Sequence, residues 1–288
     1  MPRCNPTAPT GKPHRSSASS LAPFLKWAGG KRQLLDAILR RVPGQIDTYY
    51  EPFLGGGAVF FALSNRKTYR KAVISDRNHD LIDTYRGIRD HVDDVIGLLG
   101  KMPYDRDFYY RERNKDPAAL PAAERAARII YLNRTCYNGL YRVNRSGRFN
   151  VPFGSYKRPT ILDEPLLRAV SRCLKRVSIR ESDFTDAARR AGPDDFVYFD
   201  PPYYPLSDTA CFTAYDNCPF GPEEQERLAL LMRELKQRNV RALLSNSDVK
   251  ATRKLYRGLR LERILAGRPI NSRGDRRGPI PELLVRNY

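Results

Sequence analysis

The sequence predicts an α/β fold in which short, mostly parallel strands alternate with helices around one open sheet. Two observations predict it: short apolar runs end at polar residues, as Phe196–Phe199 ends at Asp200, and helical patterns separate these runs. A third is the glycine cluster Gly55–Gly57 between a strand and a helix, a turn that brings backbone close to a ligand. The segment from about 75 to 162 fits the alternation poorly and is predicted to be an insert.

The elements before the insert follow from the spacing of apolar residues. Residues 1–20 are rich in Pro, Ser and Thr without an apolar period, so a disordered extension is expected. The leucines and isoleucine of residues 34–39 share one helical face, which predicts a helix after Lys31. The next elements are predicted to be a strand ending at Thr48–Tyr50, a helix over Ala58–Leu63, a strand over Lys71–Ser75 and one long amphipathic helix over Leu81–Leu99.

The middle of the chain changes character. Residues 131–160 contain six Lys/Arg and no Asp/Glu, and they also hold six tyrosines and phenylalanines. Arg145–Arg148 has the composition of a turn between two short strands, so the segment is predicted to be a basic, aromatic hairpin. A solvated basic face is the plainer alternative, but the interleaved aromatic residues favour a nucleic-acid-binding element.

Alternation of strands and helices resumes after the insert. Phe196–Phe199 is predicted to be a strand that leads directly into Asp200-Pro201-Pro202-Tyr203. The remaining predicted elements are a helix over Pro222–Arg238, a strand over Val240–Leu244 that ends at Ser245-Asn246, and a late strand over Glu282–Val285.

Composition excludes several classes of protein. The 288 residues carry 51 Lys+Arg against 32 Asp+Glu, and this net charge of +19 favours a polyanionic partner, most often nucleic acid. The longest nearly uncharged stretch, Phe53–Leu63, is too short to span a bilayer, and no apolar run precedes Leu21, so neither a membrane span nor a signal peptide is expected. Five cysteines without a CxxC pair and three histidines without HExxH argue against a disulfide framework and a zinc site. A reduced, cytosolic protein without a metal is therefore expected.

The first motif with chemical content is Glu51-Pro52-Phe53-Leu54-Gly55-Gly56-Gly57. The dinucleotide fingerprint would need a third glycine at the position of Phe60, so this is a nucleotide-type loop that lacks that glycine. Asp76 follows Gly57 by 19 residues at the end of the next predicted strand, where an acid can accept both hydroxyls of a ribose. The spaced acid favours cofactor binding over a purely structural turn.

The second motif, Asp200-Pro201-Pro202-Tyr203, lies where a strand reaches the ligand-binding edge of the predicted sheet. The two prolines have no N–H, so this backbone offers only carbonyl acceptors beside the Asp200 carboxylate, and Tyr203 adds a flat face. Acceptors next to a stacking face suit an exocyclic amine on a planar base. Accepting both N–H bonds frees the lone pair of such an amine for attack. A proline-stiffened turn with a packed tyrosine is the structural alternative.

The third motif, Phe24-Leu25-Lys26-Trp27-Ala28-Gly29-Gly30-Lys31, contains the only tryptophan of the chain. Its double glycine before a predicted helix can present N–H groups to a carboxylate, and Lys31 adds positive charge. An ordinary helix start with a packed tryptophan would look the same in sequence.

Together these motifs resemble those of the Dam-type N6-adenine DNA methyltransferases, the D12 class with the α order of motifs. The matching segments are FLKWAGGK (24–31), EPFLGGGAVFF (51–61), ISDRN (74–78), YLNRTCYNGLYRVNRSGRFNVPFGSYK (131–157), DPPYYPLSDTACFTAY (200–215) and LLSNSD (243–248). The resemblance extends from about residue 21 to 288. It implies a Rossmann-like class I methyltransferase sheet with an inserted helical and β-hairpin DNA-recognition domain.

The resemblance also assigns roles at the cofactor and at the target base. It implies S-adenosyl-L-methionine as the cofactor, bound by Trp27, Lys31, Phe53, Gly55, Gly57, Asp76, Asp183, Phe184 and Asp200. It implies that Asp200, Pro201, Pro202 and Tyr203 form the catalytic motif. Asp200 appears in both sets, because methyl donor and acceptor must meet in line.

For DNA, the resemblance implies that Arg142 reads a guanine edge. Lys26, Asn138, Leu140, Pro152 and Tyr156 match positions implicated in site recognition or base extrusion, and Arg134, Asn144 and Asn150 match contacts to the DNA backbone. The stretch PLSDTACFTAY after Tyr203 is closest to the GATC-methylating branch, although Tyr204 stands where smaller residues are common.

The expected activity is therefore methyl transfer to N6 of adenine in duplex DNA, first at GATC, after the base is flipped out. The expected domains are a disordered extension (1–20), a catalytic domain (21–74 with 163–288) and a DNA target-recognition domain (75–162). The expected partner is double-stranded DNA, for a monomer in the cytoplasm of a bacterial or phage-infected cell, near its nucleoid. No membrane and no obligatory protein partner are expected.

Other functions remain compatible with the residues. One is an adenine methyltransferase with a different site, paired with a cognate restriction endonuclease. Another is methylation of RNA or of a protein glutamine amide, although those enzymes usually have Asn at the position of Asp200. A third is a DNA-binding homologue without activity, which the intact Asp200–Tyr203 and Gly55–Gly57 motifs disfavour.

Overall fold

The computed structural model describes residues 20–204, 220–266 and 280–288. The tail over 1–19, the segment 205–219 with all of PLSDTACFTAY, and the segment 267–279 lie outside these residues, so the expected disordered extension (1–20) stays a prediction. In the described ranges, no helix is long and apolar enough to cross a membrane.

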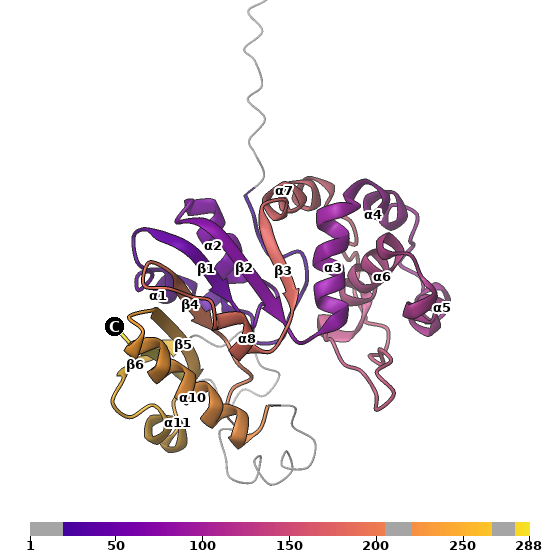
Figure 1. Cartoon of the computed structure of the whole chain (residues 1–288). Helices are drawn as coiled ribbons and strands as arrows, with labels where there is room; N and C mark the ends of the chain where they lie inside the picture. Colours follow the sequence, from indigo (N-terminus) through magenta and orange to yellow (C-terminus); the bar gives the residue numbers. More distant parts are fainter. Residues whose placement is uncertain (1–19, 205–219, 267–279) are drawn as a thin grey trace, which may run out of the picture.

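The described strands form one seven-stranded sheet in the order β3-β2-β1-β4-β5-β7-β6, which confirms the expected α/β class (Figure 1). The strands are β1 (Ile46–Glu51), β2 (Tyr69–Asp76), β3 (Val177–Glu181), β4 (Phe196–Phe199), β5 (Arg241–Ser247), β6 (Arg260–Ala266) and β7 (Ile280–Arg286). The pairs from β3 to β5 are parallel, whereas β7 runs antiparallel to both β5 and β6.

Helices cover both faces of this sheet. They are α1 (Leu35–Leu39), α2 (Ala58–Arg66), α3 (His79–Asp90), α4 (Val92–Leu99), α5 (Arg106–Asn114), α6 (Ala122–Thr135), α7 (Glu164–Leu174), α8 (Phe184–Ala188), α10 (Pro222–Gln237) and α11 (Lys250–Leu255), with 3-10 turns at Lys31–Gln33, Pro117–Ala119 and Tyr137–Gly139. Tyr49 and Tyr50 of β1 point into different hydrophobic cores, as do alternate residues of β4. This alternation is the period of two expected for a strand that is buried on both faces.

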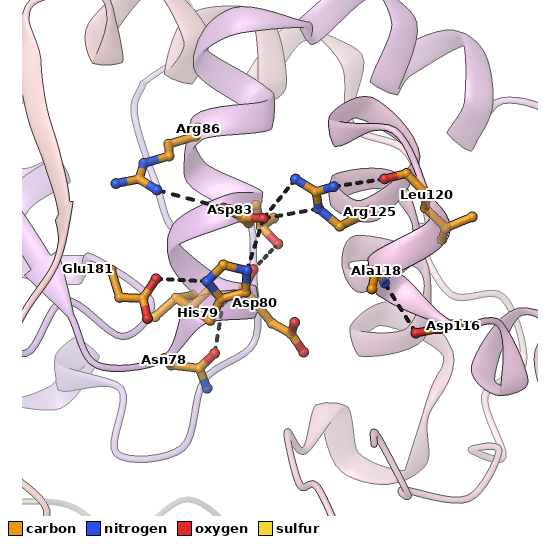
Figure 2. Close-up of polar contacts among 12 residues, drawn as sticks. Asn78, His79, Asp80, Asp83, Arg86, Asp116, Ala118, Leu120, Arg125 and Glu181 are labelled. Carbon is orange, nitrogen blue, oxygen red and sulfur yellow. Dashed lines mark hydrogen bonds and ion pairs between the residues drawn. The ribbon is translucent and has the colours of Figure 1, made fainter. Parts of the chain in front are cut away.

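The insert between β2 and β3 forms a helical lobe, residues 79–174, at the β3 side of the sheet (Figure 1). A polar chain joins lobe and sheet: Glu181 of β3 contacts Nδ1 of His79 at 2.7 Å, and Asp83 accepts from the Arg125 guanidinium of α6 at 3.0 Å (Figure 2). The hydrogen bond to the Glu181 carboxylate raises the pKa of His79. The core of one sheet face continues into the lobe through Tyr131 and Leu132.

The single long helix expected over Leu81–Leu99 is wrong, because the chain breaks at His91 (φ −133°, ψ 36°) into α3 and α4. The His91 N–H still bonds the Gly87 carbonyl and closes α3, while Asp93 and Asp94 favour the start of a new helix. Apolar spacing continues across the break, so the period alone could not reveal it.

The expected hairpin is present as a turn without regular strands. Within residues 136–156, here called the basic hairpin, the described pairing is limited to the isolated bridges Val143↔Phe149 and Cys136↔Phe153. The side-chain oxygen of Asn144 accepts the N–H groups of Ser146 and Arg148 and so fixes the turn. Tyr131 to Thr135, which the sequence analysis included in the hairpin, belong to α6.

Two glycines of the lobe offer a matched test of the packing between α3 and α6. A Cβ on Gly87 would lie 2.5 Å from the Ala126 Cβ, whereas a Cβ on Gly97 of α4 would meet nothing within 4 Å. Gly87→Ala should therefore lower the free energy of unfolding by about 1–3 kcal/mol despite its better helix propensity, and Gly97→Ala should raise it by up to about 1 kcal/mol. Urea unfolding midpoints would measure both, and equal stabilisation by the two changes would contradict the close approach of the helices.

Candidate active site

A cavity of about 560 Å³ opens at the carboxyl ends of β1, β2 and β4, the edge at which open α/β sheets bind ligands. Its wall consists of three stretches and one side chain. These are residues 23–31 apart from Phe24 and Lys26, residues 51–59 apart from Pro52, residues 198–203 apart from Phe199, and Asp76. The three sequence motifs, far apart in the chain, thus meet in one place.

The glycine turn is shaped by close contacts that exclude side chains. Gly55 (φ +48°) and Gly57 (φ +68°) have positive φ, and a Cβ on Gly55 would lie 2.8 Å from the Trp27 ring. A Cβ on Gly57 would lie 2.7 Å from the Tyr85 hydroxyl. The indole of Trp27 can therefore rest against backbone, and the turn requires glycine at both positions.

Asp76 lines the cavity beside the glycine turn. One of its carboxylate oxygens accepts the Gly55 N–H at 3.0 Å, and the other accepts the Asn78 N–H at 3.0 Å. Burial raises the pKa of Asp76, and these backbone hydrogen bonds oppose the rise. Each carboxylate oxygen has a second lone pair, so a fixed Asp76 can still accept hydroxyl groups of a ligand.

Asp200, at the end of β4, has two unequal oxygens. Its Oδ1 contacts the Lys31 ammonium at 2.7 Å and accepts from the Ser245 hydroxyl at 2.9 Å. No donor in the described ranges contacts Oδ2. Burial raises the pKa of Asp200, whereas Lys31 and Ser245 stabilise its ionised form. The carboxylate is thus held by one oxygen, which leaves the other available to a ligand on the cavity side.

Lys31 is almost fully buried and binds several partners. Besides Asp200, its ammonium donates to the Gly29 carbonyl at 2.6 Å and lies 4.6 Å from the centre of the Tyr203 ring. A buried ammonium needs such partners, because desolvation is otherwise too costly. Lys31 therefore ties the third motif to the second, in agreement with the expectation that both lie near one ligand.

The segment Asp200–Tyr203 is braced from behind by residues that sequence reasoning did not assign. Gln225 of α10 donates to the Pro202 carbonyl at 2.9 Å, and the Tyr203 hydroxyl donates to Glu282 of β7 at 2.6 Å. Asn246 of β5 accepts the Tyr204 N–H at 2.9 Å and donates to Gln225 at 3.0 Å. Two proline carbonyls follow Asp200. The Pro202 carbonyl already accepts from Gln225, so the Pro201 carbonyl is the one that can accept from a ligand.

Glu51 begins the first motif, but the sequence assigns it no role. It lines the cavity at the end of β1, is only 2% exposed, and accepts the Tyr49 hydroxyl at 2.7 Å. Burial raises the pKa of Glu51 to about 8. The uncharged Glu51 adds no negative charge, but the carboxylates of Asp76 and Asp200 outnumber the single ammonium of Lys31 on this wall. The cavity therefore suits a ligand that has hydroxyl groups and a net positive charge.

Two of the expected cofactor residues do not line the cavity. Asp183 caps the start of α8 and pairs with Arg77 at 2.8 Å and Arg227 at 3.1 Å. Phe184 is buried and stacks on Phe53, whose ring does line the cavity, at 5.4 Å between centroids. Phe184 thus reaches the site through Phe53, and the roles expected of Asp183 and Phe184 stay predictions.

The expected DNA-binding residues divide into exposed and inward-facing groups. Lys26, Asn138, Leu140, Arg142, Asn144 and Pro152 are exposed on or beside the basic hairpin. The Arg142 guanidinium donates to the side-chain oxygen of Asn150 at 2.6 Å. The Arg134 guanidinium instead turns inward and donates to the Phe24 carbonyl at 2.7 Å, and burial lowers the pKa of Arg134. Tyr156 donates to the Cys136 carbonyl at 3.0 Å, with the Lys26 ammonium 4.3 Å from its ring centre.

Comparison with known proteins agrees with the sequence motifs. The family model described as "D12 class N6 adenine-specific DNA methyltransferase" matches residues 27–268. A type II methyltransferase of Methanocaldococcus jannaschii, M.MjaIII, is 44% identical over 92% of this chain and 99% of its own length. The type II methyltransferase M1.LlaDCHI of Lactococcus lactis is 41% identical over 93% and 96%, and the DNA adenine methylase of Escherichia coli K12 is 37% identical over 91% and 94%.

The raised pKa of Glu51 predicts a pH-dependent stability. An acid whose pKa in the folded state is about 8, against an ordinary 4.5, resists ionisation, so it costs the folded protein stability progressively as pH rises from 4.5 to 8. Glu51→Gln should therefore stabilise the ligand-free protein by roughly 1–3 kcal/mol at pH 8 and much less at pH 5. Denaturant unfolding at both pH values tests this, with the exposed Glu226→Gln as the control. A gain independent of pH would contradict the buried, uncharged state of Glu51.

Proposed function

Because this chain belongs to the D12 class of N6 adenine-specific DNA methyltransferases, we propose that it methylates the adenine of GATC in duplex DNA after that base leaves the helix. The methyl donor of this family is S-adenosyl-L-methionine, and DNA is its substrate. The observation that carries the proposal is the arrangement of Asp200 on the cavity wall at the end of β4, with Oδ1 held by Lys31 and Ser245 and no donor to Oδ2 among the described residues.

Asp200 and the Pro201 carbonyl are the proposed acceptors for the two protons of the adenine amine. Lys31 and Ser245 hold Oδ1, so Oδ2 would accept one N–H while the Pro201 carbonyl accepts the other. These two hydrogen bonds draw the amine away from conjugation with the ring and make its lone pair nucleophilic. After methyl transfer the amine must lose a proton, and the Asp200 carboxylate is the nearest base that the cavity wall offers.

The cavity residues fit S-adenosyl-L-methionine, which, when bound, supplies an activated methyl group on a positively charged sulfur. Asp76 would accept the ribose hydroxyls, and the glycine turn would lie against the nucleoside without side chains in the way. The carboxylates of Asp76 and Asp200 would complement the positive charge of the donor. Lys31 and the backbone of Gly29-Gly30 remain for its carboxylate.

Base flipping is expected because the acceptors lie on the cavity wall. Asp200 lies inside a cavity, and an adenine within a stacked duplex cannot bring its N6 atom there. Tyr203 would stack on the extruded base, and its ring is held by the hydrogen bond of its hydroxyl to Glu282. The exposed residues of the basic hairpin would read the neighbouring bases, with Arg142 on a guanine, and the net charge of +19 would bind phosphates.

A modification enzyme with a different recognition site is the second candidate. Two of the relatives reported above, at 44% and 41% identity, are named type II methyltransferases, whereas the DNA adenine methylase is 37% identical. The chemistry at Asp200 would be the same in both cases, and the exposed hairpin residues would differ in the bases that they contact. A cognate restriction endonuclease would then be its functional partner.

Labelled methyl transfer onto matched duplexes tests the proposal. Duplexes that contain GATC should be labelled, and duplexes with a single-base change in that site should not. Labelling of a different adenine site would favour the second candidate and overturn GATC. No labelling of any duplex would overturn the proposed reaction.

Asp200→Ala should abolish methyl transfer and leave duplex binding largely intact, because the phosphate contacts are expected on the hairpin. The exposed Asp186→Ala, whose side chain pairs only with Arg189 among the described residues, should change neither activity nor binding. Single-turnover methylation and a fluorescence-anisotropy titration measure the two properties. Substantial turnover in Asp200→Ala would remove Asp200 from the reaction.

Arg142→Ala should lose discrimination at one base pair of the site by roughly 1–3 kcal/mol. Arg145→Ala removes an equal charge from the exposed turn of the same hairpin and should weaken binding similarly on every sequence. Methylation rates on a panel of single-base variants compare the two. A uniform loss for Arg142→Ala would identify Arg142 as a phosphate contact.

A further inference from the structure

Tyr141 connects the basic hairpin to the cofactor cavity. Its ring stacks on the ring of Trp27 with 5.1 Å between centroids and 26° between planes. Its hydroxyl donates to Asp80, at the start of α3, at 2.8 Å. Tyr141 is half-buried between two exposed residues, Leu140 and Arg142, that are expected to contact DNA. Its side chain thus packs inward, whereas its neighbours in the basic hairpin, Leu140 and Arg142, face solvent.

The two contacts of Tyr141 lead to two residues of the cavity wall, Trp27 and Asp76. Trp27 lies directly against Gly55 of the glycine turn and lines the cavity. Asp80 belongs to the first turn of α3, which follows the N-cap residue Asn78 (Figure 2). The N–H of Asn78 donates to Asp76. The hydroxyl of Tyr141 therefore binds a residue two positions from Asn78, which fixes Asp76, and the ring of Tyr141 stacks on Trp27.

The stack on Trp27 and the hydrogen bond to Asp80 hold the Tyr141 side chain in one position. Burial and the neighbouring Asp80 carboxylate raise the pKa of Tyr141, so its hydroxyl stays protonated and donates. Stacked aromatic rings favour an offset, near-parallel arrangement, which ties the position of one ring to that of the other. A ligand that fills the cavity and restrains Trp27 and Asp76 would also restrain Tyr141.

We propose that Tyr141 is a positioning residue that couples occupancy of the cofactor cavity to the arrangement of the DNA-reading residues on either side of it. The coupling rests on the proposed function, because it requires cofactor and DNA to bind where that function places them. By linkage it is reciprocal: cofactor tightens binding of the cognate duplex, and the duplex tightens binding of cofactor by the same factor.

Duplex affinity with and without S-adenosylhomocysteine tests the coupling. In the unmodified protein, saturating S-adenosylhomocysteine should tighten binding of a GATC duplex by roughly 3- to 10-fold, the range expected for loss or gain of one aromatic stack. In Tyr141→Leu this ratio should fall below about 2-fold. Tyr141→Phe keeps the stack and loses the hydroxyl contact, so it should give an intermediate ratio.

Tyr137→Leu is the matched control, because Tyr137 lies on the same hairpin and its side chain is 53% exposed. It should retain the full ratio even if it weakens binding overall. The same titrations should be run in reverse, measuring S-adenosylhomocysteine affinity with and without duplex, because a true coupling gives the same factor. Unfolding midpoints of all variants establish that they are folded.

The outcomes separate this inference from the proposed function. A full ratio in folded Tyr141→Leu, or a ratio of one in the unmodified protein, overturns the coupling even when GATC methylation proceeds normally. If the unmodified protein neither binds nor methylates any duplex, the proposed function and the coupling are both overturned. If Tyr141→Leu unfolds, Tyr141→Phe replaces it in the test. If S-adenosylhomocysteine then tightens duplex binding as much in Tyr141→Phe as in Tyr137→Leu, the role of the Asp80 contact is overturned.

Discussion

The ion pair between Lys31 and Asp200 is the interaction on which the site depends. The Lys31 ammonium is buried and the Asp200 side chain is only 19% exposed, so each charge needs the other to offset the loss of its hydration. The pair joins the N-terminal segment to the end of β4, two parts of the chain that are 169 positions apart (200 − 31). Because it uses only Oδ1 of Asp200, it also decides which oxygen faces a ligand.

The sheet order explains why these groups meet. Parallel strands β1, β2 and β4 end at the same edge, so Glu51, Asp76 and Asp200 arrive there together. The antiparallel β7 pairs with β5 in a register that sets Glu282 opposite Ser247, close enough to the Asp200–Tyr203 segment for Glu282 to accept the Tyr203 hydroxyl. The helical lobe is inserted between β2 and β3. It carries the basic hairpin, whose Tyr141 stacks on Trp27 of the cavity wall.

Much of this was predictable from the sequence, because strands and motifs are local. The strands around Thr48–Tyr50, Lys71–Ser75 and Phe196–Phe199 and the glycine turn follow from apolar runs and turn residues. The roles of Gln225, Ser245 and Glu282 were not predictable, because they arise from side chains that meet only after α10, β5 and β7 have packed. The break at His91 could not be predicted because apolar spacing continues through it. The inward orientation of Arg134 could not be predicted either, because a sequence does not distinguish a buried guanidinium from an exposed one. The division into catalytic and DNA-recognition domains stays a prediction.

A double-mutant cycle on Lys31 and Asp200 tests the central interaction most directly. Free energies of unfolding would be measured for the ligand-free protein, Lys31→Met, Asp200→Asn and the double variant under identical conditions. If the pair holds the site as described, each single change leaves a buried charge uncompensated, and the double variant is more stable than the sum of the single losses predicts by roughly 2 kcal/mol or more. Losses that add to within about 0.5 kcal/mol would contradict the account, since the two groups would then be independent.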